Sequence, residues 1–275
     1  MHSRTAESLG GRFSKVLLWV YVVAMQVFFL APVVAITVGS LTTTQYVVFP
    51  PKGLTLQWYS RMLDRPEIIY SFLLSLGIAL GAATASVLLG LLVSLAIVRY
   101  SLRLNTILWL LVASPMMLPT VVLGFGFLQT YTHLGLGTSI LGLLAGHLVI
   151  VTPYAFVLIA TGLRSVDRSL EDAARSLGAS PMRTLGLVTL PIMFWSMLAG
   201  WALAFLVSFG DAAVSVFLNT PQVVTLPVRI FDALKYSPLN PQLTAVSSVL
   251  VLVTLVVLVA SASFIRLERI MDRMR

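Results

Sequence analysis

Cysteine is absent from this chain, and charged residues are scarce. Without Cys, a disulfide framework, a thiolate metal site and a cysteine nucleophile are all excluded. Charged residues make up only 10% of the chain, against roughly 25% in an ordinary soluble domain. Hydrophobic residues reach 58%. A water-facing surface cannot be built from this composition, so the sequence indicates an integral membrane protein.

The net charge of +8 does not indicate nucleic-acid binding. Such binding needs Lys and Arg gathered on one face, whereas here the charges lie between long apolar segments.

Six apolar segments are each long enough to cross a bilayer, which takes about 20 residues of helix. They cover about 16–38, 68–98, 105–131, 140–163, 187–211 and 243–265. The first is too long for the core of a signal peptide, so we expect it to be retained. The predicted fold is all-α and polytopic, with about six transmembrane helices.

The distribution of basic residues predicts the topology, because cytoplasmic loops are enriched in Lys and Arg. With the N-terminus inside, 13 basic residues fall on the cytoplasmic side and five on the other. The five are Lys52, Arg61, Arg65, Arg229 and Lys235. We therefore expect cytoplasmic tails at 1–15 and 266–275, a transmembrane domain over 16–265 and a cytoplasmic loop over 164–186.

Proline and glycine give three local expectations. Pro115 and Pro119 predict a kink in the third span, because proline removes helix hydrogen bonds. Gly77 and Gly81 repeat at a spacing that suits close helix packing. The proline-rich segment 214–242 is typical of an extracytoplasmic loop with turns.

The loop over 164–186 contains a complete short helix. Asp167 or Ser169 can cap its start, and Gly178 can supply the left-handed residue that ends it. Ser180 and Pro181 then begin another helix. An apolar stripe of Leu170, Ala173, Ala174 and Leu177 suits either docking to a partner or lying on lipid headgroups. Amphipathicity alone does not decide between the two.

The same loop resembles a known signature. Asp172-Ala173-Ala174, three residues, Gly178, nine residues and then Val188-Thr189-Leu190-Pro191 match the EAA motif of ABC importer permeases, E-A-A-x3-G-x9-I-x-L-P, at every spacing. Asp172 replaces the usual Glu and Val188 the usual Ile, both with similar chemistry.

The resemblance implies a MetI-like permease fold with a cytoplasmic coupling helix that docks on an ATPase subunit. The residues it assigns to coupling are Glu171, Asp172, Ala173, Ala174, Leu177, Gly178, Leu190 and Pro191. The chain has no phosphate-binding G-x-x-x-x-G-K-[ST] loop. We therefore expect no enzyme activity, metal or cofactor in this chain, and expect the partner ATPase to bind ATP and Mg.

A further resemblance, to the spermidine/putrescine (PotC-like) type of permease, covers nearly the whole length. Three stretches carry this resemblance: residues 49–59, Ala199-Gly200-Trp201, and the stretch that runs from 208–211 to 225–230. It implies uptake of a polyamine across the bacterial inner membrane. The implied partners are a second, PotB-like permease chain, two ATPase subunits and an extracytoplasmic binding protein that the 214–242 loop helps to receive. Gly210 stands where this type often has an acid, which leaves Asp211 alone.

Three side chains in the spans are candidates for function. Asp211 is the acid nearest the membrane core and suits the substrate path, a helix end at the interface or pairing with a partner subunit. Trp201 can hold an ammonium group on its ring face. We expect His147 to be a packed, hydrogen-bonding residue, because no second ligand stands at metal spacing.

Two alternatives remain. The same machine can carry another small solute, such as an aminophosphonate, an opine or ferric iron. A stand-alone secondary transporter usually needs charges within the membrane for ion coupling. Apart from Asp211 the spans contain essentially none, and such a carrier gives no reason for an EAA loop.

Overall fold

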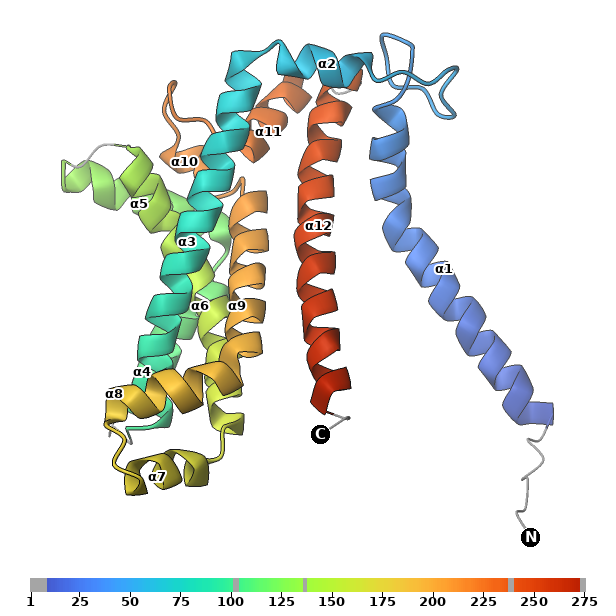
Figure 1. Ribbon diagram of the computed structural model, residues 1–275. Coiled ribbons are helices and arrows are strands. Elements are labelled where there is room, and N and C mark those ends of the chain that lie inside the picture. Colours follow the sequence, from blue (N-terminus) through green and yellow to red (C-terminus); the bar gives the residue numbers. More distant parts are fainter. Residues whose placement is uncertain (1–8, 101–103, 136–137, 237–239, 273–275) are drawn as a thin grey trace. The chain divides into compact units, whose positions relative to one another are not determined.

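The computed structural model describes residues 9–100, 104–135, 138–236 and 240–272 (Figure 1). In these ranges the regular structure is helical, apart from one isolated bridge between Thr42 and Leu54. The chain divides into two compact units, 1–64 with 237–251 and 65–236 with 252–275.

The first unit holds α1 (Leu9–Gly39), α2 (Gln57–Leu63) and the beginning of α12 (Pro241–Asp272). Hydrogen bonds fasten the long connection after α1 to the other two helices. Trp58 Nε1 donates to the carbonyl oxygen of Thr42 over 2.7 Å. The Tyr59 hydroxyl lies 2.6 Å from both Ser40 Oγ and Ser248 Oγ.

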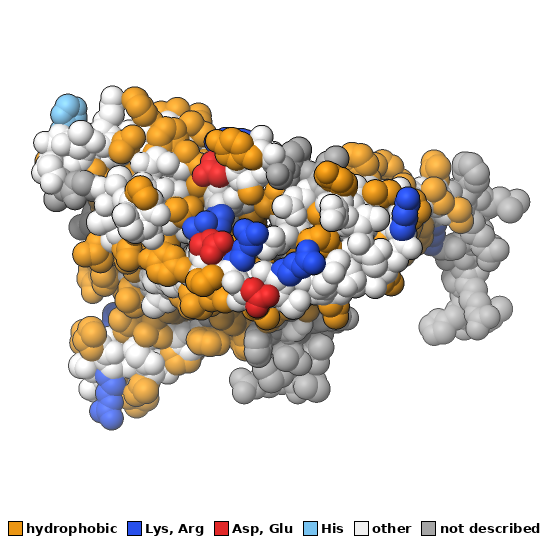
Figure 2. Space-filling view, turned by 90° about the horizontal axis from the view of Figure 1, so that it is seen from above, with side chains coloured by type: hydrophobic (Ala, Val, Ile, Leu, Met, Phe, Trp, Pro, Cys, Tyr) orange, Lys and Arg blue, Asp and Glu red, His pale blue; other side chains and the backbone are white. Residues whose placement is uncertain are grey.

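Five helices of the described chain are long and apolar enough to cross a membrane. They are Ser14–Gly39, Pro66–Val98, Ile140–Ser165, Pro181–Gly210 and Pro241–Ser263. A sixth crossing results if the bent pair described next counts as one span. Large hydrophobic side chains stay exposed along α1, including Trp19 at 69%, and hydrophobic atoms cover much of the face in Figure 2. Such surfaces suit lipid contact, so the expectation of about six spans is confirmed.

The third span is not a single kinked rod, which corrects the expectation for 105–131. It consists of α4 (Asn105–Ala113), the 3-10 turn η1 (Ser114–Met117) and α5 (Thr120–His133), with a bend of 104° between the two halves. Leu118 adopts extended backbone angles, φ −96° and ψ 142°. A residue before proline is driven out of the helical region, so Pro119 breaks the helix instead of only kinking it.

The core of the second unit is formed by α3 (Pro66–Val98), α6 (Ile140–Ser165) and α9 (Leu190–Gly210). Two glycines let their backbones approach. A Cβ on Gly90 would lie 3.1 Å from the backbone nitrogen of Phe156, and one on Gly200 would lie 3.2 Å from the carbonyl oxygen of Ala155. Gly77, by contrast, faces open space. A Cβ on Gly81 would lie 3.3 Å from Leu144 Cδ1. Close packing therefore occurs at Gly81, as its spacing predicts, but not at Gly77.

Short helices follow α6 at one end of the unit (Figure 1). After α7 (Arg168–Ser176), the chain turns into α8 (Pro181–Thr184), continues through a π-helical turn η2 (Leu185–Thr189) and enters α9. The three segments from Pro181 to Gly210 form one continuous helical run.

The described part of the expected loop 214–242, up to Tyr236, is more regular than a turn-rich loop. It contains α10 (Ser215–Leu218) and α11 (Leu226–Tyr236). Pro227 lies in the first turn of α11, where a missing N–H costs nothing. The start of α11 is bound to α3, because the Leu226 N–H donates to Ser75 Oγ over 2.8 Å and Arg229 Nε donates to Ser71 Oγ over 2.7 Å.

Candidate functional site

Helix α7 begins and ends where its sequence predicts. The Asp167 carboxylate caps the first turn by accepting a hydrogen bond from the Ser169 N–H over 2.9 Å. Backbone and side-chain hydrogen bonds from Ser169 hold the pKa of Asp167 below its ordinary value. At the other end Gly178 has φ +87°, the left-handed conformation that glycine adopts without strain. Ser180 then caps α8 by accepting from the Arg183 N–H.

One face of α7 is open to solvent. The Asp172 side chain is 69% exposed and forms an ion pair with Arg175 of the same helix, over 3.3 Å. Ala173 and Gly178 are exposed, Ala174 is half-buried, and Leu177 is 90% exposed. A nearly bare leucine beside small residues forms a surface to which another backbone can come close.

Glu171 points the opposite way, into the protein. Its side chain is only 7% exposed and forms an ion pair with Arg99 at the end of α3, with Nη2 and Oε1 3.1 Å apart. Arg99 Nε donates to the same oxygen over 3.2 Å, and the Thr189 hydroxyl donates to it over 2.9 Å. A buried carboxylate needs such partners, because an unpaired one is costly.

The Glu171 carboxylate therefore joins three elements: the end of α3, helix α7 and the π-helical turn before α9. Arg99 Nη2 also donates to the carbonyl oxygen of Val166, and Arg168 Nη2 donates to that of Val98. Sequence spacing gave no signal for this junction, since Arg99 and Glu171 lie 72 positions apart. Of the residues assigned to coupling by resemblance, Glu171 supports α7 from within instead of facing outward.

The last two assigned residues lie at the start of α9. Leu190 is half-buried and Pro191 is exposed. Pro191 occupies the first turn of α9, directly after the π-helical turn. These residues follow Thr189, the hydroxyl donor to Glu171, so they continue the helix that the junction anchors.

A second polar cluster lies at the far end of α9. The Asp211 side chain is 7% exposed, and its Oδ2 accepts from the N–H groups of Val214 and Ser215 over 3.1 and 3.0 Å. His147 Nδ1 lies 2.7 Å from Ser208 Oγ, and its Nε2 lies 2.9 Å from Ser215 Oγ. His147 is buried and hydrogen-bonded, as expected. Asp211 stands at the C-terminal end of α9 and fixes the turn into α10, in agreement with the helix-end alternative for this residue.

Trp201 lies half-buried near the middle of α9. Its indole N–H donates to Thr84 Oγ1 of α3 over 3.2 Å. The ring stacks on Phe205, with centroids 5.6 Å apart, and Phe205 stacks on Phe209. One face of the indole is thus covered by the aromatic column, while the residue as a whole keeps part of its surface exposed.

Among the described residues, no group of three or more His, Asp or Glu side chains could hold a metal ion. The arrangement instead offers an exposed helix, a buried ion pair behind it and polar contacts between spans.

The chain is similar to several curated permeases. It is 29% identical over 230 residues to the putrescine transport system permease protein PotI of Escherichia coli K12, covering 81% of each chain. It is 27% identical over 241 residues to the spermidine/putrescine permease PotC of the same strain, covering 88% of this chain and 90% of that one. A putative 2-aminoethylphosphonate permease, PhnV of Salmonella paratyphi A, is 30% identical over 250 residues, with 90% and 91% covered.

Solved structures share the fold. A chain of a bacterial ABC transporter that imports the acidic polysaccharide alginate superimposes with a TM-score of 0.72 at 17% identity, covering 93% of this chain and 97% of that one. A chain of the MetNI methionine ABC transporter gives a TM-score of 0.62 at 16% identity, with 72% and 94% covered.

Residues 86–274, well over half of the sequence, match a single family description. This region includes α7, the Arg99–Glu171 junction and the polar cluster at Asp211. The chain belongs to the family of binding-protein-dependent transport system inner membrane components.

Proposed function

We propose that this chain couples ATP hydrolysis by a separate ATPase subunit to movement of its own membrane helices during import of a polyamine. The observation that carries the coupling role is the two-sided construction of α7. Its outer face presents Asp172 and Ala173, while its inner face is fastened through Glu171 to α3 and α9.

A docked partner that pulls or pushes α7 would act directly on two spans. Arg99 is the C-terminal cap of α3, and Thr189 is the last residue of the turn that precedes α9. Because the ion pair is buried, separating its members carries a larger cost than breaking a surface pair. Displacement of α7 is therefore passed to the spans rather than absorbed at the junction.

The proposal includes the topology and the partners. Both termini and α7 lie in the cytoplasm, in agreement with 13 basic residues on that side against five on the other. A second permease chain completes the path, two ATPase subunits supply ATP and Mg binding, and an extracytoplasmic protein delivers substrate.

A charge reversal on the outer face of α7 tests the docking surface. Asp172→Lys should reduce the amount of ATPase subunit that co-purifies with the permease. Asp232→Lys is a matched control, because Asp232 also pairs with a residue three positions on, Lys235, over 3.1 Å on an exposed helix. Equal retention of the ATPase by both variants would contradict docking on α7.

A polyamine substrate is supported by the similarity to PotI and PotC and by aromatic and acidic groups within α9 and at its end. Trp201 can hold an ammonium group against its ring, and Asp211 supplies negative charge near the end of the span. The similarity to PhnV favours a second candidate, an aminophosphonate.

Uptake by cells that express the complete importer distinguishes these substrates. Radiolabelled putrescine and spermidine should enter, and excess 2-aminoethylphosphonate should not compete. Asp211→Asn should weaken polyamine uptake more than Ser208→Ala, which removes a hydrogen bond from the same cluster but no charge. Competition by the aminophosphonate would favour the second candidate, and uptake without any ATPase subunit would refute coupling.

A further inference from the structure

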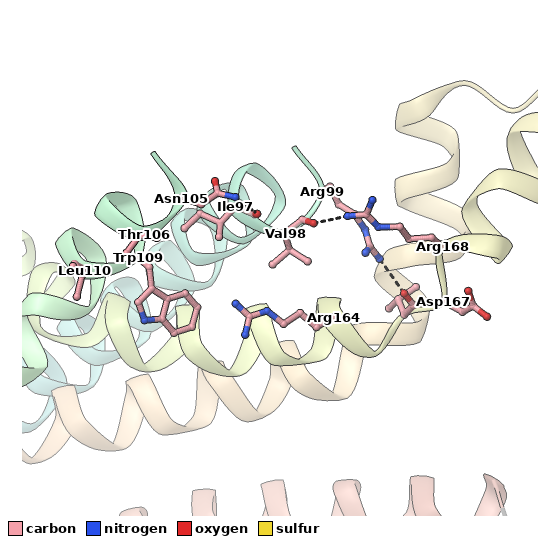
Figure 3. Close-up of a pocket in the computed structure, with 11 residues that line it drawn as sticks. Ile97, Val98, Arg99, Asn105, Thr106, Trp109, Leu110, Arg164, Asp167 and Arg168 are labelled. Atoms are coloured by element: carbon pink, nitrogen blue, oxygen red, sulfur yellow. Dashed lines mark hydrogen bonds between the residues drawn. The ribbon is translucent and has the colours of Figure 1, made fainter. Parts of the chain in front are cut away.

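A cavity of about 770 Å³ lies beside α7, between the C-terminal ends of α3 and α6 and the start of α4. Three of its lining residues are arginines: Arg99, Arg164 and Arg168. Its apolar wall includes Ile97, Val98, Trp109 and Leu110. Figure 3 shows the guanidinium groups of Arg99 and Arg168 next to each other, and that of Arg164 near the indole of Trp109.

Two of these arginines carry charge that the protein does not neutralise. Arg99 is balanced by Glu171. In the described part of the chain, neither Arg164 nor Arg168 forms an ion pair with a carboxylate. Asp167 is the one acidic residue among the described residues that line the cavity. It caps α7, and in Figure 3 its side chain points away.

The two uncompensated guanidinium groups are nevertheless held in place. Arg164 lies over the Trp109 ring, 5.1 Å from its centroid. Arg168 donates to the carbonyl oxygen of Val98 over 2.7 Å, which leaves its other N–H groups free. Positively charged donors that are fixed before a ligand arrives bind phosphate strongly.

We propose that this cavity binds the phosphate group of an anionic phospholipid. Arg164 and Arg168 donate to the phosphate oxygens, and the acyl chains lie along Trp109 and Leu110. Leu110 is 54% exposed, and α4 is apolar throughout after Thr106, so the wall continues onto a surface that suits lipid. A headgroup that carries hydroxyls also supplies a donor for Asn105 Oδ1, a buried acceptor without a partner that lines the cavity.

The apolar wall distinguishes a lipid source from free phosphate. Inorganic phosphate gains only the contacts with the two arginines, whereas a phospholipid also buries apolar surface. Basic pockets between membrane helices on the cytoplasmic side are a recognised way of holding such headgroups, with each Lys or Arg near the surface worth about 1 kcal/mol, or about a five-fold change in affinity.

Lipid retention by the full-length purified chain tests the site. Native mass spectrometry in detergent should show phosphatidylglycerol retained in preference to phosphatidylcholine. Arg164→Gln and Arg168→Gln should each lower the affinity for phosphatidylglycerol about five-fold, and the double variant about thirty-fold. Arg61→Gln is the matched control, because Arg61 also lies over a tryptophan, Trp58, at 4.9 Å.

Two comparisons separate the outcomes. Arg164→Lys and Arg168→Lys should keep most of the preference, and thermal unfolding of each variant shows whether the chain still folds. Equal retention of the two lipids, or retention of phosphatidylglycerol by the double variant, would overturn the site. Displacement of the lipid by an equal concentration of inorganic phosphate would overturn a lipid source in favour of a soluble anion.

Discussion

Replacement of Gly178 by alanine isolates the role of one backbone angle. The residue has φ +87°, and a Cβ added there meets no atom within 4 Å. The substitution therefore causes no clash, and its cost is conformational. An L-residue in the left-handed region costs roughly 1–2 kcal/mol, which corresponds to a population change of about 5-fold to 30-fold.

That strain acts at the end of α7. An alanine at position 178 relieves this strain by leaving the left-handed conformation. That change moves the short segment that joins α7 to the cap of α8 at Ser180. We expect Gly178→Ala to reduce substrate uptake per ATP hydrolysed by about 5-fold to 30-fold, since the helix no longer sits in its docked orientation in most molecules.

Gly135 offers a matched control, because its φ is +65° and a Cβ there also meets nothing within 4 Å. Gly135→Ala carries the same kind of strain at the end of α5, away from α7. Both variants should lower thermal stability by a similar amount, measured in detergent, while only Gly178→Ala changes the ratio of uptake to ATP hydrolysis in proteoliposomes. An equal loss of coupling in Gly178→Ala and Gly135→Ala would refute a specific role of the Gly178 backbone angle in coupling.

Three further outcomes follow from the geometry. Arg99→Gln should destabilise the chain by up to about 3–5 kcal/mol, because it removes the nearer ion-pair partner of the buried Glu171 and leaves the longer pair with Arg175, at 3.9 Å; thermal unfolding measures this, and an unchanged midpoint would contradict it. Gly90→Ala should lower the unfolding temperature through overpacking worth about 1–3 kcal/mol, while Gly77→Ala, which faces open space, should not. The Asp167 pKa is lowered in the folded chain, so its capping is present at neutral pH and lost as pH falls through that folded pKa. Hydrogen exchange in α7 should therefore rise at acid pH, and much less so in Asp167→Asn.

Local features were the ones that sequence reasoning predicted well. Long apolar runs identified the membrane helices, because burial of the backbone in lipid requires continuous helix. Capping by Asp167, the left-handed Gly178 and the new helix at Ser180 all follow from residue chemistry over a few positions. The hydrogen-bonded state of His147 follows from the cost of burying an unpaired polar group.

One long-range contact and two local features are not predicted correctly from the sequence. Arg99 was counted only as a basic residue on the cytoplasmic side, since nothing in its neighbourhood indicates that Glu171 lies beside it. The break at Leu118 was underestimated as a kink, although the restriction that Pro119 places on its predecessor was available. For Asp211 the sequence allows the substrate path, a helix end or pairing with a partner subunit, but it does not specify the turn that gives this residue its backbone partners at Val214 and Ser215.

The π-helical turn η2 makes the number of residues between α7 and α9 matter, in addition to which residues they are. A π turn is an α-helix that accommodates one extra residue, and each residue of an α-helix advances the chain by about 100° around its axis. Deleting one residue within Leu185–Thr189 would restore regular helix with little rotation of the segments on either side, whereas deleting one residue from the regular helix of α9 would rotate everything before it by about that angle. Nine residues separate Gly178 from Val188, and part of the π turn lies among them, so the turn can absorb one residue of this count without a large rotation of α7 relative to α9. A single deletion within the π turn should therefore harm coupling less than a single deletion within α9.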